Sequence, residues 1–336
     1  MNADTIKRIV RAIADESQED LALLARKVIK DERQSGHEKL ADQLESILDR
    51  SRPRHAGSKT SVESGRSLQE LPLSRRHREA LTTLMPQDSL EHYMVLPPAV
   101  EERFIRVERE YAARERLGAF GLRPRKTILL YGPPGCGKSL GAKRLAWNTG
   151  LSLMKVRFDA LISSYFGESA ANLRTVFDAA KERPCVLLLD ECDFIARSRV
   201  GSKDIGEAAR IVNSLLQLME EYDAPGLLVA TTNVESSLDE ALFRRFDDVF
   251  MVPLPGPSEI EKLLKVTLAA VQVSDRIDWQ ESVRLLEGEP AAMVVKTAQD
   301  AAKAAVLSGQ KIVGSSQLKA AIADLKLCGR DSARDG

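Results

Sequence analysis

Residues 132–139 read Gly-Pro-Pro-Gly-Cys-Gly-Lys-Ser, and the fold can be worked out from this stretch. It follows an apolar run, Thr127–Tyr131, that is typical of a buried strand, and it precedes a helical pattern over residues 140–149. The spacing G-x-x-x-x-G-K-S in this position is the pattern of a phosphate-binding P-loop. The glycines let successive backbone N–H groups point into one concavity, and the following helix directs its positive end there. We therefore expect the loop to bind a nucleoside triphosphate.

The P-loop residues have separate expected roles. The ammonium group of Lys138 would reach the β- and γ-phosphates, and the hydroxyl of Ser139 would ligate Mg²⁺. The full set of residues expected to contact the nucleotide is Pro133, Pro134, Gly135, Cys136, Gly137, Lys138, Ser139 and Leu140.

Two further apolar runs end in polar side chains. Cys185–Leu189 is followed by Asp190 and Glu191, and Leu227–Thr231 leads to Asn233. The ligand of a parallel α/β sheet lies at the carboxyl ends of its strands, so these side chains are expected beside the P-loop. Asp190 would hold the Mg²⁺ water shell, and Glu191 would orient and polarise the attacking water. Asn233 would bond the γ-phosphate or that water, although Asn at a strand end is more often a turn former.

Strands and helices alternate through the middle of the chain. The expected strands are short apolar runs, as strands buried on both faces should be: Thr127–Tyr131, Ser152–Val156, Cys185–Leu189, Leu227–Thr231 and Val249–Val252. Helices are predicted between them over residues 140–149, 168–182 and 205–221. The sequence therefore predicts an α/β fold with a parallel five-stranded sheet and flanking helices.

Composition divides the chain into five predicted parts. They are a small helical N-terminal domain (1–50), a flexible linker (51–70), a connecting segment (71–95), an α/β nucleotide-binding domain (96–256) and an all-α lid domain (257–330). The first part is either a structural appendage or an adaptor for a partner. In the connecting segment, Leu81, Leu84 and Met85 predict a short helix that ends at Pro86.

Two capping boxes are predicted in the lid. Ser258 with Glu261, and Asp278 with Glu281, have the spacing at which a side chain caps the start of a helix.

Overall charge and cysteine content narrow the functional classes. The 49 basic residues balance the 49 acidic residues, which argues against nucleic acid or an anionic membrane as a partner, apart from a local basic patch at 50–54. No apolar run approaches the roughly 20 residues of a membrane span. The four cysteines show no CxxC pair or zinc spacing, and the charged N-terminus does not fit a signal peptide. We therefore expect reduced thiols and a cytoplasmic protein.

In order and spacing, the P-loop, the Asp-Glu strand and the Asn strand resemble the AAA family of ATPases. Two other segments are similar to that family. Residues 163–169, followed by Asn172, Leu173 and Arg174, resemble its pore-loop region, and residues 239–247 resemble its arginine-finger segment. The resemblance covers about residues 95–310. It implies ATP and Mg²⁺ as cofactors and a homo-oligomeric ring, usually a hexamer, with ATP between subunits.

The same resemblance implies roles for four side chains. Arg244 and Arg245 would act in trans on the γ-phosphate of the next subunit, or else form ion pairs within the chain. The family often has Arg-Pro-Gly-Arg here, and Arg245, directly before Phe246, is the first choice. Tyr165 and Phe166, next to Gly167, would line a central pore and grip an extended polypeptide, or else pack in a core beside a loop.

We therefore expect ATP hydrolysis coupled to remodelling or unfolding of a protein substrate. Residues 36–41 resemble a bacterial AAA group that is often found with a subtilisin-like serine protease in plasmid-incompatibility or phage-defence settings. That resemblance implies such a protease as partner. Two alternatives stay open: an ATP-dependent switch or loader acting on DNA, and a nucleotide-controlled scaffold that regulates a partner protease.

Overall fold

The computed structural model describes residues 72–73, 79–162, 169–192, 205–233, 244–309 and 312–331. The chain divides into two units, 1–68 and 69–336, and every described residue belongs to the second. The predicted N-terminal domain and linker lie outside the described residues. So do the three residues of the predicted pore loop, Tyr165, Phe166 and Gly167.

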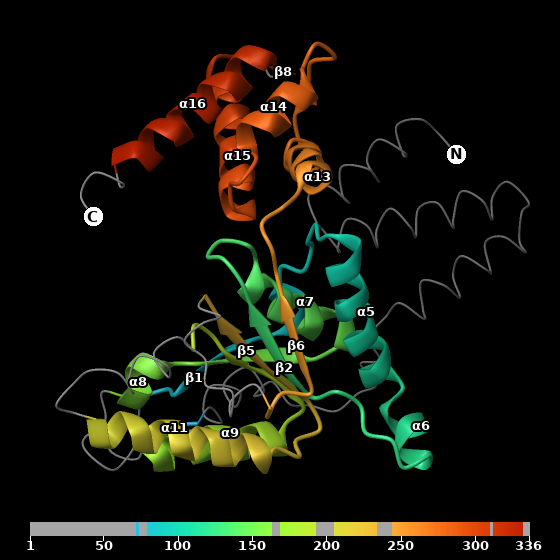
Figure 1. The fold of residues 1–336 in the computed structure, drawn as a ribbon, viewed down its shortest axis with the longest axis vertical. Coiled ribbons are helices and arrows are strands. Elements are labelled where there is room, and N and C mark those ends of the chain that lie inside the picture. Colours follow the sequence, from blue (N-terminus) through green and yellow to red (C-terminus); the bar gives the residue numbers. More distant parts are fainter. Residues whose placement is uncertain are drawn as a thin grey trace, which may run out of the picture. The chain divides into compact units, whose positions relative to one another are not determined.

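A six-stranded sheet forms the framework of residues 79–251 (Figure 1). Its strand order is β1-β3-β4-β5-β2-β6, and every neighbouring pair is parallel except β1 with β3. The bounds are β1 Thr82–Met85, β2 Thr127–Tyr131, β3 Ser152–Val156, β4 Cys185–Leu189, β5 Leu227–Thr232 and β6 Asp248–Met251. The α/β fold with a mostly parallel sheet is therefore confirmed.

The predicted count of five strands is wrong because of β1. Residues 82–85, predicted to be the end of a short helix, pair antiparallel with β3, from Thr82 opposite Val156 to Met85 opposite Leu153. A free edge of β3 would expose unpaired N–H and C=O groups, and pairing with β1 satisfies them. Four residues are too few to distinguish helical from strand periodicity, so the long-range pairing decides the structure.

Helices cover both faces of the sheet. Their bounds are α5 Pro98–Ala112, α6 Arg114–Ala119, α7 Lys138–Thr149, α8 Phe158–Ile162, α9 Ser169–Glu182 and α11 Ile205–Glu220, with a 3₁₀ turn η1 at Gln87–Ser89. Figure 1 shows α9 and α11 together, apart from α5 and α7. Alternate residues of one strand enter different cores: Leu129 packs in the core that includes α9 and α11, and Ile128 and Leu130 pack in the core that includes α5 and α7. This burial on two faces explains the continuous apolar runs of the strands.

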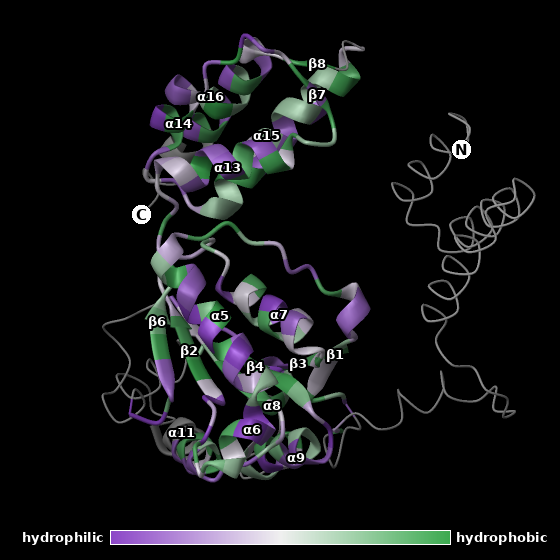
Figure 2. Cartoon of the chain, turned by 90° about the vertical axis from the view of Figure 1, so that its right-hand side faces the viewer, coloured by the Kyte–Doolittle hydropathy of each residue, from purple (hydrophilic) through white to green (hydrophobic). Residues whose placement is uncertain are grey.

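The residues after β6 build a separate apolar core from four helices. They are α13 Pro257–Thr267, α14 Trp279–Leu286, α15 Ala291–Leu307 and α16 Ser315–Asp331. The prediction of an all-α part is wrong in one detail, because β7 Gln272–Val273 and β8 Ile312–Val313 form a parallel pair that joins its two loops. Figure 2 shows mixed hydrophilic and hydrophobic colours on these helices, as expected for amphipathic helices around a core.

Of the two predicted capping boxes, the one at Asp278 is confirmed for its N-cap hydrogen bond, and the Glu281 carboxylate forms an ion pair with Lys319 at 2.6 Å. Asp278 caps α14 by accepting the backbone N–H of Glu281 at 2.9 Å. The Ser258 prediction is wrong: Pro257 already begins α13, so Gly256 is the N-cap and the Ser258 hydroxyl donates to Glu259 at 2.7 Å. None of the helices within the described ranges combines the length and the apolar character needed to cross a membrane.

Candidate active site

The P-loop joins β2 to α7, as the sequence predicts. Gly132 has φ 138°, and a Cβ there would lie 2.3 Å from the carbonyl oxygen of Val252, so only glycine fits. Gly137 has φ 95° and is the left-handed N-cap of α7, which begins at Lys138. The backbone therefore curls at the point where α7 presents its free N–H groups, and this geometry suits an anion.

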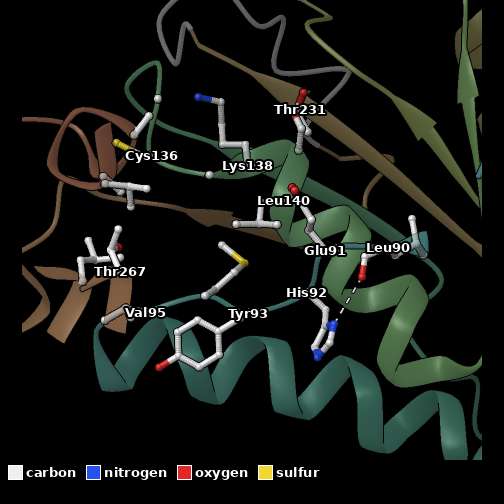
Figure 3. Close-up of a pocket in the computed structure, with 18 of the residues that line it drawn as sticks. Leu90, Glu91, His92, Tyr93, Val95, Cys136, Lys138, Leu140, Thr231 and Thr267 are labelled. Atoms are coloured by element: carbon white, nitrogen blue, oxygen red, sulfur yellow. Dashed lines mark hydrogen bonds between the residues drawn. The ribbon is translucent and has the colours of Figure 1, made fainter. Parts of the chain in front are cut away.

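Lys138 lies within this curl. Its side chain is buried, and its ammonium group donates to the carbonyl oxygens of Gly132 and Pro133 at 2.8 Å each. The loop's own carbonyl groups thus hold the cation close to the P-loop backbone. Figure 3 shows Lys138 among the residues that line the pocket.

Asp190, at the end of β4, is the most heavily bonded side chain of the site. Its Oδ1 accepts from the hydroxyl of Ser139 at 2.6 Å and from that of Thr231 at 2.7 Å. Its Oδ2 forms an ion pair with the ammonium group of Lys155 on β3 at 2.6 Å. Burial alone would raise the pKa of Asp190, but the hydrogen bonds from Lys155, Ser139 and Thr231 outweigh it and hold the pKa below its ordinary value. Asp190 is therefore an anion at neutral pH.

The donor set beside Lys138 fits Mg²⁺. A hydroxyl oxygen and an ionised carboxylate, on Ser139 and Asp190, lie within hydrogen-bond distance of each other. Mg²⁺ prefers such hard oxygen ligands, commonly one or two carboxylates together with waters and substrate phosphates. The predicted metal-binding pair is thus brought together by the fold.

Glu191 and Asn233 line the same cavity as the P-loop. Glu191 is exposed, and its backbone has φ 56°, the left-handed region. Its N–H donates to the hydroxyl of Thr231 at 2.9 Å. An exposed carboxylate in the cavity beside the P-loop can act on a water molecule there. Five predicted site residues, Lys138, Ser139, Asp190, Glu191 and Asn233, therefore come together.

The cavity has a volume of about 920 Å³, and one of its walls was not predicted. This wall is the segment 88–95, and Figure 3 shows Tyr93 and Val95 of this segment among the residues that line the pocket. It is braced by His92, whose ring stacks on that of Trp147 of α7 with centroids 4.1 Å apart. The only signal in the sequence was a run of apolar residues before Pro97, which does not reveal its partner.

Another wall comes from α13 and α15, which belong to the part of the chain predicted as a lid. The backbone N–H of Ala292 donates to the carbonyl oxygen of Gly135 in the P-loop at 2.9 Å. Pro290 packs against the same glycine, where an added Cβ would lie 3.1 Å away. Cys136 is buried beside this contact, and burial raises the pKa of its thiol. The first turn of α15 and the P-loop therefore touch directly.

Arg244 and Arg245 are not part of this cavity. They precede β6, and the next residue but one, Asp247, binds the start of β2: its carboxylate accepts the N–H groups of Lys126 at 2.8 Å and Thr127 at 2.9 Å. Arg245 forms an ion pair with Glu220 at 2.6 Å, whereas Arg244 is exposed. The arginines thus lie at the opposite end of β2 from the P-loop.

Comparison with known proteins agrees with this geometry. Residues 128–254 match the family model "ATPase family associated with various cellular activities (AAA)". An uncharacterized AAA family ATPase, y4kL, of Sinorhizobium fredii is 33% identical over 307 residues, which cover 91% of this chain and 90% of that protein. A proteasome-activating nucleotidase of Methanoculleus marisnigri is 33% identical over 249 residues, 72% of this chain and 60% of that protein. The P-loop fold, the acidic end of β4 and these relatives together place the chain in the AAA family of ATPases.

Proposed function

We propose that this AAA ATPase hydrolyses ATP in a homo-oligomeric ring and uses the energy to remodel or unfold a protein substrate. One observation carries the proposal: Lys138, Ser139, Glu191 and Asn233 line one cavity, while the candidate arginines lie at the opposite end of β2. The site is therefore divided in a way that a neighbouring copy would complete.

Within one chain, each group has a step to perform. AAA ATPases bind ATP and usually Mg²⁺, and bound Mg²⁺ supplies charge neutralisation on the transferred phosphoryl group. The backbone N–H groups of the P-loop and the ammonium of Lys138 hold the phosphates in place. Glu191 accepts a proton from the attacking water, and Asn233 orients that water or the γ-phosphate. Ser139 and Asp190 would hold Mg²⁺.

The arginines support an oligomer because of their distance from the P-loop. Strand β2 has five residues, so its first and last Cα atoms are about 13 Å apart at about 3.3 Å per step. Neither Arg244 nor Arg245 can span this length to the phosphates of its own chain. Another subunit that presents them to the cavity would neutralise charge that develops in the transition state. A hexameric ring with trans-acting arginines is the arrangement that we propose.

The nature of the substrate rests on sequence similarity. One relative is named a proteasome-activating nucleotidase, and this name supports the unfolding of a protein substrate as the proposed work. We propose that Tyr165 and Phe166 line the pore, and that residues 1–50 form an adaptor ahead of the nucleotide-binding domain (96–256) and lid (257–330). A subtilisin-like protease partner, a role in bacterial defence or plasmid incompatibility, and a cytoplasmic location complete the proposal.

The test is the variant Glu191→Gln, which keeps the size of the side chain and removes its basicity. We expect ATP turnover to fall by about 10²- to 10⁴-fold, the usual contribution of a general base, while binding of a fluorescent ATP analogue is retained. ATP-dependent unfolding of a destabilised fluorescent reporter protein should be lost with it. Glu287→Gln, an exposed glutamate outside the cavity, is the matched control. Unchanged turnover in Glu191→Gln would refute the mechanism.

A further inference from the structure

Thr231, near the end of β5, contacts each of the three residues that follow β4. Its hydroxyl donates to Asp190 Oδ1 at 2.7 Å and accepts the N–H of Glu191 at 2.9 Å. Its carbonyl oxygen accepts the N–H of Cys192 at 2.8 Å. Thr231 is 1% exposed, so water does not compete for these bonds.

Glu191 needs such support because of its backbone. Within the described parts of the chain it is the one residue other than glycine with positive φ, 56°. Side chains with a Cβ rarely adopt this region, and residues held there depend on neighbouring groups that fix them. Two hydrogen bonds to Thr231 fix the peptide groups on either side of Glu191. The N–H of Glu191 bonds the Thr231 hydroxyl, and the N–H of Cys192 bonds the Thr231 carbonyl oxygen.

We propose that Thr231 is a positioning residue for ATP hydrolysis, which aims Glu191 into the cavity by fixing its backbone. The inference rests on the proposed role of Glu191 as the base. The direction of the hydroxyl makes the arrangement specific. Because the hydroxyl proton is directed at Asp190, a lone pair of the same oxygen is left to face Glu191 N–H. One side chain thus links the metal-binding acid to the base.

The sequence does not identify this role. Thr231 reads as the last residue of an apolar strand, and the polar residue that stands out there is Asn233. Only the register of β5 beside β4, with Ala230 opposite Leu189, brings the Thr231 side chain to the residues that follow Leu189.

The decisive variant is Thr231→Val, which keeps the branched shape and cannot donate or accept a hydrogen bond. We expect kcat for ATP to fall by about 10²-fold, the loss typical of a catalytic group displaced by about 1 Å. The Kd of a fluorescent, non-hydrolysable ATP analogue with Mg²⁺ should stay within about threefold, because Ser139 and Lys155 still hold Asp190. Thr231→Ser restores the hydroxyl and should bring kcat to within about threefold of the original protein.

The matched control is Thr297→Val on α15. Thr297 is also buried, and its hydroxyl donates to the carbonyl oxygen of Met293 at 2.8 Å, outside the cavity. We expect its kcat to be unchanged. If Thr231→Val does not fold, Thr231→Ala removes the same hydroxyl without adding an apolar group, and the same kcat loss is expected from it.

Three outcomes would overturn the inference: a normal kcat in Thr231→Val, an equal loss in Thr231→Ser, or a fall of kcat and nucleotide affinity together. The double variant Thr231→Val with Glu191→Gln adds a further test. If the two residues act as one unit, the kcat of the double variant should be no lower than that of Glu191→Gln alone. Failure of the proposed function is distinguishable, because there Glu191→Gln itself would keep its turnover.

Discussion

The ends of the parallel strands form two edges of the sheet, a carboxyl edge and an amino edge. They differ in how many of the proposed active-site groups are held by contacts within one chain. At the carboxyl edge, Ser139, Lys155 and Thr231 all contact Asp190, and Lys138 is held by loop carbonyls. At the amino edge, Arg244 is exposed. The first edge is preorganised by contacts within the chain, and the second presents a cation outward. This contrast is what an enzyme needs if two copies share one active site.

Strand β2 connects these two edges. Asp247 accepts the N–H and the hydroxyl of Thr127 at its first residue, both at 2.9 Å, and Gly132 follows its last. The segment that presents Arg244 is thus fastened to the same buried strand that ends in the P-loop. The predictions below address each edge separately.

The largest effect is expected from Arg244→Ala. An arginine that neutralises transition-state charge contributes about 10³- to 10⁵-fold, so we expect turnover to fall at least about 10³-fold while nucleotide binding persists. Arg245→Ala should lower turnover less, because Arg245 forms a partly exposed ion pair with Glu220. Such a pair contributes about 0–1 kcal/mol. Steady-state turnover of both variants measures the difference.

Mixed assemblies give the stricter form of that test. Arg244→Ala and Glu191→Gln are each inactive alone if the site is shared, but a mixture contains interfaces in which both original groups are present. Partial recovery of turnover on mixing is expected. Equal loss in Arg245→Ala would contradict the choice of Arg244, and no recovery in any mixture would contradict the division of the site between subunits.

Much of the carboxyl edge could be predicted from the sequence because its signals are local. The P-loop, Asp190 and Glu191 each follow directly from a strand whose apolar run is continuous. By contrast, β1 forms through pairing with β3 some 70 residues later, and its four residues carry no period of their own. Ser258 matched a capping pattern, but α13 begins one residue earlier, at Pro257, so Ser258 lies inside the helix.

The residues that support Asp190 could not be predicted from the sequence for a related reason. Lys155 and Thr231 look like ordinary strand residues until the order β3-β4-β5 brings them beside Asp190. Likewise, the segment 88–95 becomes a wall of the cavity only when it packs along α7. The role of Arg245 also depends on a tertiary partner, because its ion pair with Glu220 within the chain is the alternative that the sequence leaves open for the two arginines.

A smaller effect is expected from Asp247→Ala at the amino edge. The change leaves two N–H groups and the Thr127 hydroxyl without their acceptor, which costs about 1–2 kcal/mol. The melting temperature should fall by about 2–8 °C, because each kcal/mol lowers it by about 2–4 °C for a domain of this size. Turnover should fall about tenfold because the Arg244 segment loses its anchor, as a displaced catalytic group does.

Asp223→Ala is the matched control for Asp247→Ala. Its carboxylate is 96% exposed and contacts the neighbouring Lys126 ammonium at 3.2 Å, so its loss should change neither quantity. Binding of an ATP analogue at the far edge should be unaffected in both variants. A large loss of nucleotide affinity in Asp247→Ala would show that the two edges are not separable.

The smallest effect concerns Lys155, which stands at the carboxyl edge as an internal counter-ion. Its ammonium neutralises the Asp190 oxygen that Ser139 and Thr231 leave open, so it competes with a divalent cation for the same carboxylate. With the Lys155 side chain 41% exposed, the pair contributes at most about 1 kcal/mol, equivalent to about fivefold in affinity. In Lys155→Met, the Mg²⁺ concentration for half-maximal binding of a fluorescent ATP analogue should therefore fall about fivefold.

The sign of this change separates two roles for Lys155. Loss of the ammonium removes one of the bonds that lower the pKa of Asp190, but the ordinary pKa of a carboxyl group lies far below neutral pH, so Asp190 remains an anion in the assay. A competitor that is removed lowers the Mg²⁺ requirement, whereas a lost structural support raises it. Lys303→Met, which removes the same charge from an exposed pair with Asp300 on α15, should leave the requirement unchanged. A raised requirement in Lys155→Met would mean that the carboxyl edge needs this lysine to hold Asp190 in place, and that its preorganisation depends on β3 as well as on β5.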